Sequence, residues 1–429
     1  MKEIFYQLAL RTFTPEGTLN AARERLLYVA SLGTTVIYLC PCFKEDDDPD
    51  MATWSPRQIA SRTMNPKNPY KIVDYFSVDS EFGCDKDLVD FIKEAHKLGM
   101  KVLLDLVYLH CGKNAQFLKV HPDYAEQDEN GNIKIGETWP FARIDFSNKD
   151  AREYLLSNMK HLITYYDCDG FRCDCGNMIP LDFWRDSFEE VKKLSDNLMF
   201  LNEGDLYEGR DKVFDIAYNW DWRKNLLETI HEGKSAQFIR DYVDNATYFS
   251  RGITYLDQHD TASDCGLGRN ELLLTSRGMD AAFVLTFTTS AQPLIWNGIE
   301  IADNQENNMF ADRMHTKRCE INWSRAFTED GTRRLALVKE LAKIFKEQSA
   351  ITEAKPQYIE NSVSDDIITY IKSNGEESIF IAVNMRDREI SATVDKAYEG
   401  TELLSYGAVI SGKEIKLSAF GYTVIKINN

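Results

Sequence analysis

The stretch Cys168-Asp169-Gly170-Phe171-Arg172-Cys173-Asp174-Cys175 reads as a short strand that carries charge where a buried strand usually carries none. Because alternate residues of a strand share a face, Arg172 and Asp174 point the same way. An arginine beside an aspartate favours the ionised carboxylate, and an ionised carboxylate can act as a nucleophile. The same pair can instead be a buried ion pair that holds strands together. These residues alone leave both interpretations open.

Outward from this stretch, apolar strands alternate with helical patterns in both directions along the chain. Each strand is almost continuously apolar, as is typical of parallel strands that are buried on both faces. The predicted strands are 4–10, 34–39, 100–107, 169–174, 198–203, 213–217, 251–257 and 293–296. This rhythm predicts an α/β protein with a (β/α)8 TIM barrel, whose functional site lies at the carboxyl ends of its strands.

Two parts of the chain depart from the strand–helix rhythm. One contains Gly, Pro, His and charged residues and follows the third predicted strand, so we interpret it as a small inserted subdomain. In the other, β-like runs replace the helices, and Asn374-Gly375 between two apolar runs indicates a hairpin. The predicted domains are the barrel (1–108 and 148–350), the inserted subdomain (109–147) and a C-terminal antiparallel β-sandwich (351–429). We expect the sandwich to be a structural cap, with ligand binding as the alternative.

The charge balance limits the classes of partner. The 429 residues carry a net charge of -18. Binding to nucleic acid or to an anionic membrane needs a basic surface, so we expect neither partner, whereas a neutral sugar is indifferent to this field. The first residues, Met1-Lys2-Glu3-Ile4, lack a signal segment, and no apolar run reaches membrane length. We therefore expect a cytoplasmic location.

The cysteines fit reduced thiols better than a disulfide framework, because their number, nine, is odd and they are scattered. Cys173 and Cys175 flank Asp174 and could be mistaken for metal ligands. No second Cys/His pair stands at zinc spacing, so we expect no metal there.

Polar residues follow four of the predicted strands at their carboxyl ends. They are Asp105 with His110, Arg172 with Asp174, Glu203, and His259 with Asp260. Each alone can be a cap or a satisfied polar group. Convergence on one rim is harder to explain in that way, because carboxylates that are buried together raise one another's pKa. Three acids and an arginine suit cleavage of a glycosidic bond, in which one carboxylate attacks, one acid donates a proton and one holds the substrate.

Glu203, as the proton donor, must be protonated near neutral pH. A free glutamate with a pKa of about 4.3 is protonated only about once in 500 at pH 7. Raising this pKa to about 6–7 requires roughly 3 kcal/mol, which burial beside Asp174 and Asp260 can supply.

These motifs, in this order, resemble those of the α-amylase-type enzymes of glycoside hydrolase family 13. The four are Asp105-Leu106-Val107-Tyr108-Leu109-His110, Gly170-Phe171-Arg172-Cys173-Asp174, Leu201-Asn202-Glu203 and Leu256-Asp257-Gln258-His259-Asp260. A further run, Pro293 to Glu300, resembles the family's last barrel strand, and Tyr70, Asp74 and Tyr75 resemble the region before its second helix. The likeness covers essentially the whole chain.

The resemblance implies a role for each residue. Asp174 is expected as the nucleophile of a retaining mechanism and Glu203 as the acid/base, with carboxyl groups about 5–5.5 Å apart. Asp260 is expected to bind sugar hydroxyls and stabilise the transition state. The expected substrate-binding residues are Arg172, His110, His259, Asp105 and Tyr70. Of these, Arg172 is expected to orient Asp174, and Tyr70 is expected to be the stacking platform.

Some positions depart from the family pattern. Leu109 stands where many members carry a calcium-binding Asn, and Leu cannot ligate a hard cation, so we expect no cofactor and no calcium there. Asn177-Met178 and Lys71 also replace residues that contact long glucans in many members. Together these departures favour an enzyme acting on short α-glucosides or maltodextrins over a secreted starch amylase.

Two other functions remain open at this stage. One is a catalytically silent carbohydrate-binding protein on the same barrel, which the intact acids disfavour. The other is an unrelated barrel enzyme with a glycine-rich phosphate loop, for which Gly266 and Gly268 are the nearest candidates. The sequence leaves hydrolysis against transfer, linkage and oligomeric state undecided.

Overall fold

The computed structural model describes residues 2–263, 269–311 and 319–428. Within them, eight parallel strands form one sheet in the order β10-β11-β12-β1-β2-β5-β8-β9. The two ends of this order meet at a parallel bridge between Leu201 and Ile216, so the sheet closes on itself. The strands are β1 (Phe5–Leu8), β2 (Val36–Leu39), β5 (Lys101–Leu106), β8 (Gly170–Cys173), β9 (Met199–Asn202), β10 (Ala217–Tyr218), β11 (Gly252–Tyr255) and β12 (Gln292–Trp296). The predicted TIM barrel is confirmed.

The barrel strands are buried on both faces, which explains their continuous apolar sequences. One face contributes to a cluster inside the barrel that includes Phe5, Tyr38 and Leu103. The other face packs under the surrounding helices, with Tyr6 and Leu104 among its members. Asp105 lies two residues after Leu103 on the same strand and therefore shares its interior face. Because Asp105 pairs with Arg172 on β8, both charged residues belong to this face at the carboxyl end of the barrel.

Helices surround the barrel, and their ends follow local sequence signals. The long α6 begins after Asn148, whose side chain accepts hydrogen bonds from the N–H groups of Asp150 and Ala151. The apolar residues within 19–32 have the spacing of one helix, but the segment forms two short helices that meet at Arg25. The main helices are α2 (Leu19–Glu24), α3 (Leu26–Ser31), α5 (Asp85–Lys97), α6 (Lys149–Tyr166), α7 (Leu181–Lys192), α8 (Asp221–Ile230), α9 (Gln237–Asn245), α11 (Asn270–Leu273), α12 (Thr275–Thr288) and α13 (Glu329–Glu347).

The sixth barrel strand starts later than the predicted 213–217. Residues up to Val213 end a short 3₁₀ turn, and the observed strand is β10. The apolar side chain of Phe214 packs against Phe188 and Trp184 of α7, so this part of the run serves loop packing. An apolar run alone does not separate these two uses.

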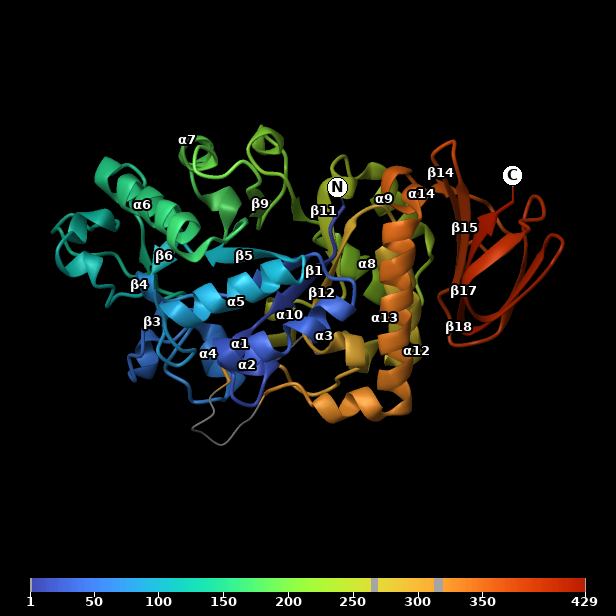
Figure 1. Ribbon diagram of the computed structural model, residues 1–429, viewed down its shortest axis with the longest axis horizontal. Helices are drawn as coiled ribbons and strands as arrows, with labels where there is room; N and C mark the ends of the chain where they lie inside the picture. Colours follow the sequence, from blue (N-terminus) through green and yellow to red (C-terminus); the bar gives the residue numbers. More distant parts are fainter. Residues whose placement is uncertain (1, 264–268, 312–318, 429) are drawn as a thin grey trace.

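The two long connections at the top of the barrel hold structure of their own. The long polar segment 41–85 contains β3 (Phe43–Glu45), α4 (Pro56–Ser61) and β4 (Ile72–Val78), with β3 and β4 paired antiparallel. In the segment 109–147, β6 (His110–Cys111) pairs with β7 (Ala142–Arg143). These connections lie at the opposite end of the molecule from the C-terminal strands (Figure 1).

The C-terminal strands form an antiparallel unit beyond α12 and α13 (Figure 1). The strands are β13 (Gln357–Tyr358), β14 (Ile367–Ser373), β15 (Ser378–Asn384), β16 (Ile390–Thr393), β17 (Gly400–Ser411) and β18 (Glu414–Ile427). The predicted hairpin is β14–β15, with Gly375 at a φ of 92° in its turn. All six strands belong to one sheet, because β18 pairs with β15 along one half and with β16 along the other. Both halves contribute to a common core that includes Phe380 and Leu417.

In the described ranges, no helix combines the length and the apolar character that crossing a membrane requires.

Candidate active site

Arg172 lies at the centre of a cluster of carboxylates at the carboxyl end of the barrel. Its Nη1 donates to Asp105 Oδ1 at 2.8 Å and to Asp174 Oδ1 at 2.8 Å. Its Nη2 lies 2.6 Å from Glu203 Oε1. The arginine side chain is fully buried, so its charge is compensated within the protein. One guanidinium on β8 therefore contacts acids that come from β5, β8 and the end of β9.

Asp105 is held from both sides and faces away from solvent. Besides Arg172, its Oδ2 accepts hydrogen bonds from the Tyr38 hydroxyl at 2.8 Å and the Tyr70 hydroxyl at 3.0 Å. The Tyr70 ring stacks on the His259 ring, with 5.5 Å between their centroids. Asp105 therefore fixes the tyrosine predicted as the stacking platform and shares one arginine with Asp174.

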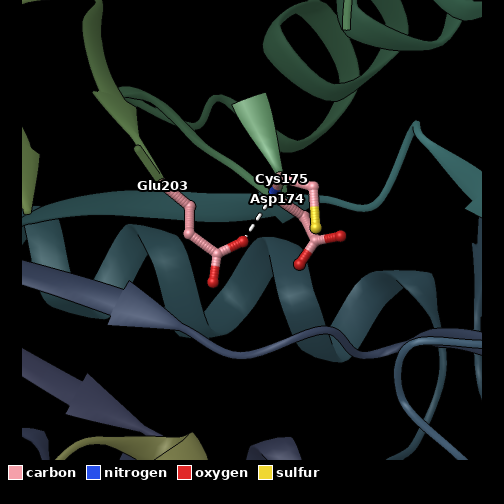
Figure 2. Close-up of side chains that lie close together, drawn as sticks. All are labelled: Asp174, Cys175 and Glu203. Carbon is pink, nitrogen blue, oxygen red and sulfur yellow. Dashed lines mark hydrogen bonds between the residues drawn. The ribbon is translucent and has the colours of Figure 1, made fainter. Parts of the chain in front are cut away.

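Asp174 and Glu203 lie side by side at the ends of adjacent strands (Figure 2). The backbone N–H of Cys175 donates to Glu203 Oε2 at 2.6 Å. A carboxylate oxygen of each acid and Cys175 Sγ all lie within 4.8 Å of one another. The second oxygen of Asp174, Oδ2, has no hydrogen-bond partner among the described residues. One oxygen of Asp174 is thus fixed by Arg172, while the other is available to a ligand.

Asp260 approaches the same site from α10 (His259–Ser263), after strand β11. Its backbone N–H donates to Gln258 Oε1 at 2.8 Å, and its Oδ1 forms an ion pair with Arg57 of α4. The preceding His259 is held by Gln7 of β1, whose Nε2 lies 2.6 Å from His259 Nδ1. These contacts bring Asp260 and His259 to the rim that holds Asp174 and Glu203.

A pocket of about 460 Å³ joins these groups. A volume of this size suits a small molecule or a short oligosaccharide. His110 lines it, with its ring stacked on Phe141 at a centroid distance of 4.4 Å. The pocket is further lined by Tyr70, Asp174, Glu203, His259, Asp260, Arg57, Trp139, Leu109, Met178, Met309 and Phe310, among others. Of the predicted site residues, Asp105 and Arg172 lie beneath this lining and the other six form part of it.

Burial dominates the protonation of the site. It raises the pKa of Asp174 well above its ordinary value, and the neighbouring Glu203 charge raises that pKa further. Burial also raises the pKa of Glu203. Because Asp174 and Glu203 share one guanidinium, ionisation of one acid disfavours ionisation of the other, and the two titrate as a coupled pair.

Asp260 differs from this pair. Burial acts to raise its pKa, but His259 and Arg57 outweigh burial and hold the pKa below its ordinary value. Burial lowers the pKa of His259 to about 3, so this ring is neutral near pH 7 and the positive charge beside Asp260 belongs to Arg57. His110 is also neutral, because burial lowers its pKa to about 4.

The residues present do not favour a metal in this site. Asp174, Cys175 and Glu203 have the spacing of metal ligands, but the Arg172 guanidinium already contacts both carboxylates. Leu109 is buried in the pocket wall and offers no oxygen, so position 109 does not fit a calcium ligand.

Sequence reasoning missed residues that hold or line the site. Gln7 had a detectable signal, because it is a buried polar residue within an apolar strand. Arg57 and Trp139 had none, since they lie in long connections, far along the chain from the acids with which they line the pocket. Asn177, noted as a departure, bonds through Oδ1 to Asn202 Nδ2 at 2.8 Å and thus braces the residue before Glu203. The candidate phosphate-loop glycines Gly266 and Gly268 lie outside the described residues.

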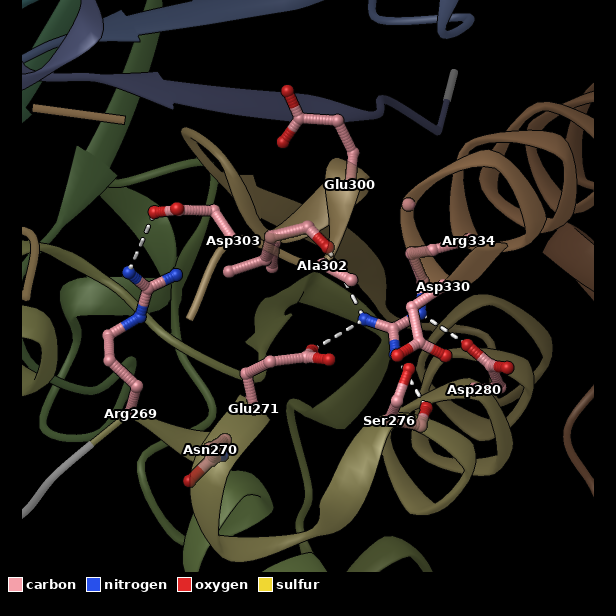
Figure 3. Close-up of polar contacts among 12 residues, drawn as sticks. Arg269, Asn270, Glu271, Ser276, Asp280, Glu300, Ala302, Asp303, Asp330 and Arg334 are labelled. Carbon is pink, nitrogen blue, oxygen red and sulfur yellow. Dashed lines mark hydrogen bonds and ion pairs between the residues drawn. The ribbon is translucent and has the colours of Figure 1, made fainter. Parts of the chain in front are cut away.

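A polar network connects the end of β11 with the residues from Arg269 onward. Arg269 Nε donates to Asp257 Oδ2 at 3.3 Å, and the amide of Asn270 donates to the Leu256 carbonyl at 2.6 Å. Figure 3 shows Arg334 of α13 between Glu271 and Asp280, with Arg269 directed at Asp303. These contacts tie the end of β11 to α11, α12 and α13.

The fold and the site define a class of protein: a TIM-barrel protein with a carboxylate-rich pocket at the carboxyl ends of its strands. Residues 6–131 match the family model described as the α-amylase catalytic domain. The matched residues contain the barrel strands β2 and β5 and part of the segment 109–147, so this part of the chain is similar to α-amylase catalytic domains.

Curated relatives align with most of the chain. The chain is 24% identical over 405 residues to α-amylase 2 of Dictyoglomus thermophilum, covering 87% of this chain and 65% of that protein. It is 26% identical over 414 residues to a cyclomaltodextrinase of Geobacillus thermopakistaniensis, covering 88% and 64%. The chain thus spans somewhat less than two thirds of the length of these relatives.

Solved structures share the fold along nearly the whole chain. A maltogenic α-amylase from Thermotoga neapolitana superposes with a TM-score of 0.78 at 22% identity, over 99% of this chain and 96% of that one. An α-amylase from Geobacillus thermoleovorans, solved as a complex with acarbose, gives 0.76 at 20% identity, over 100% and 98%. At these identities the likeness shows the fold.

Proposed function

We propose that the protein is a retaining α-glycosidase of the α-amylase type, which cleaves or transfers α-glucosidic bonds in short α-glucans or α-glucosides. The observation that supports this most strongly is the Asp174–Glu203 pair. Their closest oxygens lie within 4.8 Å, which matches the short carboxylate separation of retaining enzymes and leaves no room for a water between acid and sugar.

Each acid has a role that its contacts support. Asp174 Oδ2 attacks the anomeric carbon and forms a covalent glycosyl ester, while Oδ1 stays on Arg172. Glu203 donates its proton to the leaving oxygen and then takes a proton from the incoming water or sugar hydroxyl. Asp260, held ionised, binds hydroxyls of the attacked ring and stabilises the positive charge that develops on it.

The preference for short substrates rests on the pocket and on the relatives. The acids line a pocket whose walls include Tyr70, Trp139 and Phe141. Aromatic faces of this kind suit sugar rings. The names of the relatives include maltogenic amylase and cyclomaltodextrinase, which we take as support for oligosaccharides as substrates. We further propose that the protein acts in the cytoplasm.

Paired amide substitutions test the assignment. Asp174→Asn and Glu203→Gln should each lower turnover of an activated α-glucoside such as p-nitrophenyl α-glucoside by several decades. Asp167→Asn and Glu208→Gln make the same chemical changes at exposed positions and should keep wild-type rates. With a fast leaving group, azide should restore part of the activity of Glu203→Gln, because a small anion needs no general base, but not that of Asp174→Asn. Wild-type rates in both site variants would remove the assignment.

The silent carbohydrate-binding alternative predicts a different result. Calorimetry on the wild-type protein would then show binding of maltotriose without product formation over a panel of α-glucans. Product profiles from maltotriose, isomaltose, trehalose and sucrose, separated by chromatography, would distinguish linkage and would separate hydrolysis from transfer.

A further inference from the structure

Arg57 belongs to the pocket, but the proposed mechanism gives it no role. It reaches Asp260 across 203 residues of sequence and forms an ion pair with Oδ1 of that carboxylate. Its guanidinium also lies over the Trp139 ring of the inserted segment, 5.9 Å from the ring centroid. Arg57 thus bridges α4, the inserted segment and the acid proposed to hold the sugar.

The helix that carries Arg57 is firmly anchored. The Ser55 and Gln58 side chains form a capping box at the start of α4, and Pro56 occupies its first turn. Gln58 Nε2 donates to the Pro66 carbonyl at 3.0 Å, and Asn68 Nδ2 donates to Gln58 Oε1 at 3.0 Å. Because Asn68 Oδ1 also accepts the N–H of Tyr70 at 2.9 Å, α4 is fixed to the stacking platform. Arg57 is therefore part of a built pocket wall.

The proposed roles of the acids indicate which end of the substrate Arg57 faces. If Glu203 protonates the leaving oxygen, the leaving group lies on the Glu203 side, and the ring under attack lies against Asp260. Arg57 lines the pocket and pairs with Oδ1 of Asp260, so we place it on the side where a glucan chain would continue beyond the attacked ring. A guanidinium presents several N–H donors, which can bind the hydroxyl groups of a chain end.

We propose that Arg57 determines specificity by closing the glycone side of the pocket behind a single terminal sugar. The substrate class is then α-glucosides and short α-glucans with a free non-reducing end, from which one sugar unit at a time is removed or transferred. This inference rests on the proposed function, because it takes the roles of Asp260 and Glu203 from it.

The test compares two substrates that differ only at the non-reducing end: p-nitrophenyl α-maltotetraoside and the same compound with its terminal 4- and 6-hydroxyls blocked by an ethylidene group. The wild-type protein should use the free substrate, produce glucose first, and refuse the blocked one. Arg57→Ala should lower kcat/KM on the free substrate, since a charge-assisted hydrogen bond is worth about tenfold or more. It should also lower the ratio of kcat/KM on the free substrate to kcat/KM on the blocked substrate, because loss of the arginine side chain opens this side of the pocket.

Arg57→Lys and Arg62→Gln complete the set. The lysine keeps the charge with less reach, so its ratio should fall between the wild-type and alanine values. Arg62 ends the same helix with an exposed side chain, and its replacement should leave the ratio unchanged. A variant that only loosened the fold would lower both rates and leave their ratio as it was.

The outcomes separate the inference from the function beneath it. Maltose as the first product, or equal use of the free and blocked substrates by the wild-type protein, overturns the role of Arg57 and leaves the glycosidase proposal standing. An unchanged ratio in Arg57→Ala overturns it as well. Failure of the wild-type protein to act on any α-glucoside overturns the proposed function instead.

Discussion

Arg172 Nη2 lies 2.6 Å from Glu203 Oε1, so an arginine from the fourth barrel strand contacts the acid that ends the fifth. The same guanidinium bonds Asp105 and Asp174, and it is fully buried. Arg172 therefore sets the separation of the two proposed catalytic carboxylates and compensates their charge at the same time.

Replacement of Arg172 should separate these two contributions. Arg172→Lys keeps one positive charge but cannot bridge three carboxylates, so we expect kcat/KM to fall by about a hundredfold or more with a modest loss of stability. Arg172→Met leaves the buried carboxylates uncompensated and should cost about 3–5 kcal/mol of unfolding free energy. Urea unfolding and p-nitrophenyl α-glucoside kinetics measure both. Near-wild-type kinetics in Arg172→Lys would contradict the bridging role.

Tyr70 offers a test of the stacking platform. Its ring stacks on His259 and its hydroxyl bonds Asp105, so the two contributions can be removed separately. Tyr70→Phe keeps the ring and should change KM little, at a cost of about 1 kcal/mol in stability from the lost hydrogen bond. Tyr70→Ala removes the aromatic face and should raise KM for maltotriose about tenfold or more. Equal KM values for the two variants would show that the ring does not contact the sugar.

The coupling between the two acids predicts a shift in titration. The Glu203 charge is, after burial, the main cause that raises the pKa of Asp174. Glu203→Gln removes that charge and should therefore lower the pKa of Asp174, extending its ionised form to lower pH. Carbon-13 NMR of protein labelled at the aspartate carboxyl carbons would follow this titration, with Asp174→Asn used to assign the resonance. An unchanged or higher pKa would contradict the coupling.

Glu300 predicts a pH dependence of stability that is separate from catalysis. It is fully buried, and its Oε1 accepts hydrogen bonds from the Tyr6 and Tyr28 hydroxyls at 3.0 and 3.1 Å. Burial raises its pKa from 4.5 to about 7. The stability it contributes is thus fully present below about pH 4.5 and is lost as the pH rises toward 7, because only the unfolded chain ionises in that window.

Urea unfolding at pH 5.5 and pH 8 measures this effect. Wild-type protein should lose about 2 kcal/mol between these values through Glu300, whereas Glu300→Gln should lack that component. The variant is expected to be less stable than wild type at pH 5.5, since an amide nitrogen cannot accept the Gly298 N–H that Glu300 Oε2 now accepts at 2.9 Å. A parallel loss in both proteins would show that other groups carry the dependence.

Local pattern accounted for much of the architecture. The continuous apolar runs predicted the barrel strands because both faces of each strand are buried, and the Asn374-Gly375 turn predicted the β14–β15 hairpin. The predicted strand 213–217 begins too early, because the apolar side chain of Phe214 packs against α7 and not within the sheet. The interruption at Arg25 is not visible in the helical spacing of residues 19–32, which continues across it.

The candidate site divides in the same way. Asp105, Arg172, Asp174, Glu203 and Asp260 could be selected from sequence because charge at the end of an apolar strand is costly and parallel strands end at one rim. Arg57 and Trp139 could not be assigned, since their neighbours come from distant parts of the chain.

The sequence by itself therefore determined the barrel and the residue types at its rim, because continuous apolar runs and charged residues at strand ends are local features of the sequence. Only the tertiary structure decided how those charges are shared: one guanidinium contacts three carboxylates, and Arg57, from a helix in a long connection, pairs with the fourth. The physical reason is that protonation and pocket shape depend on distances between groups far apart in the chain, which only packing sets.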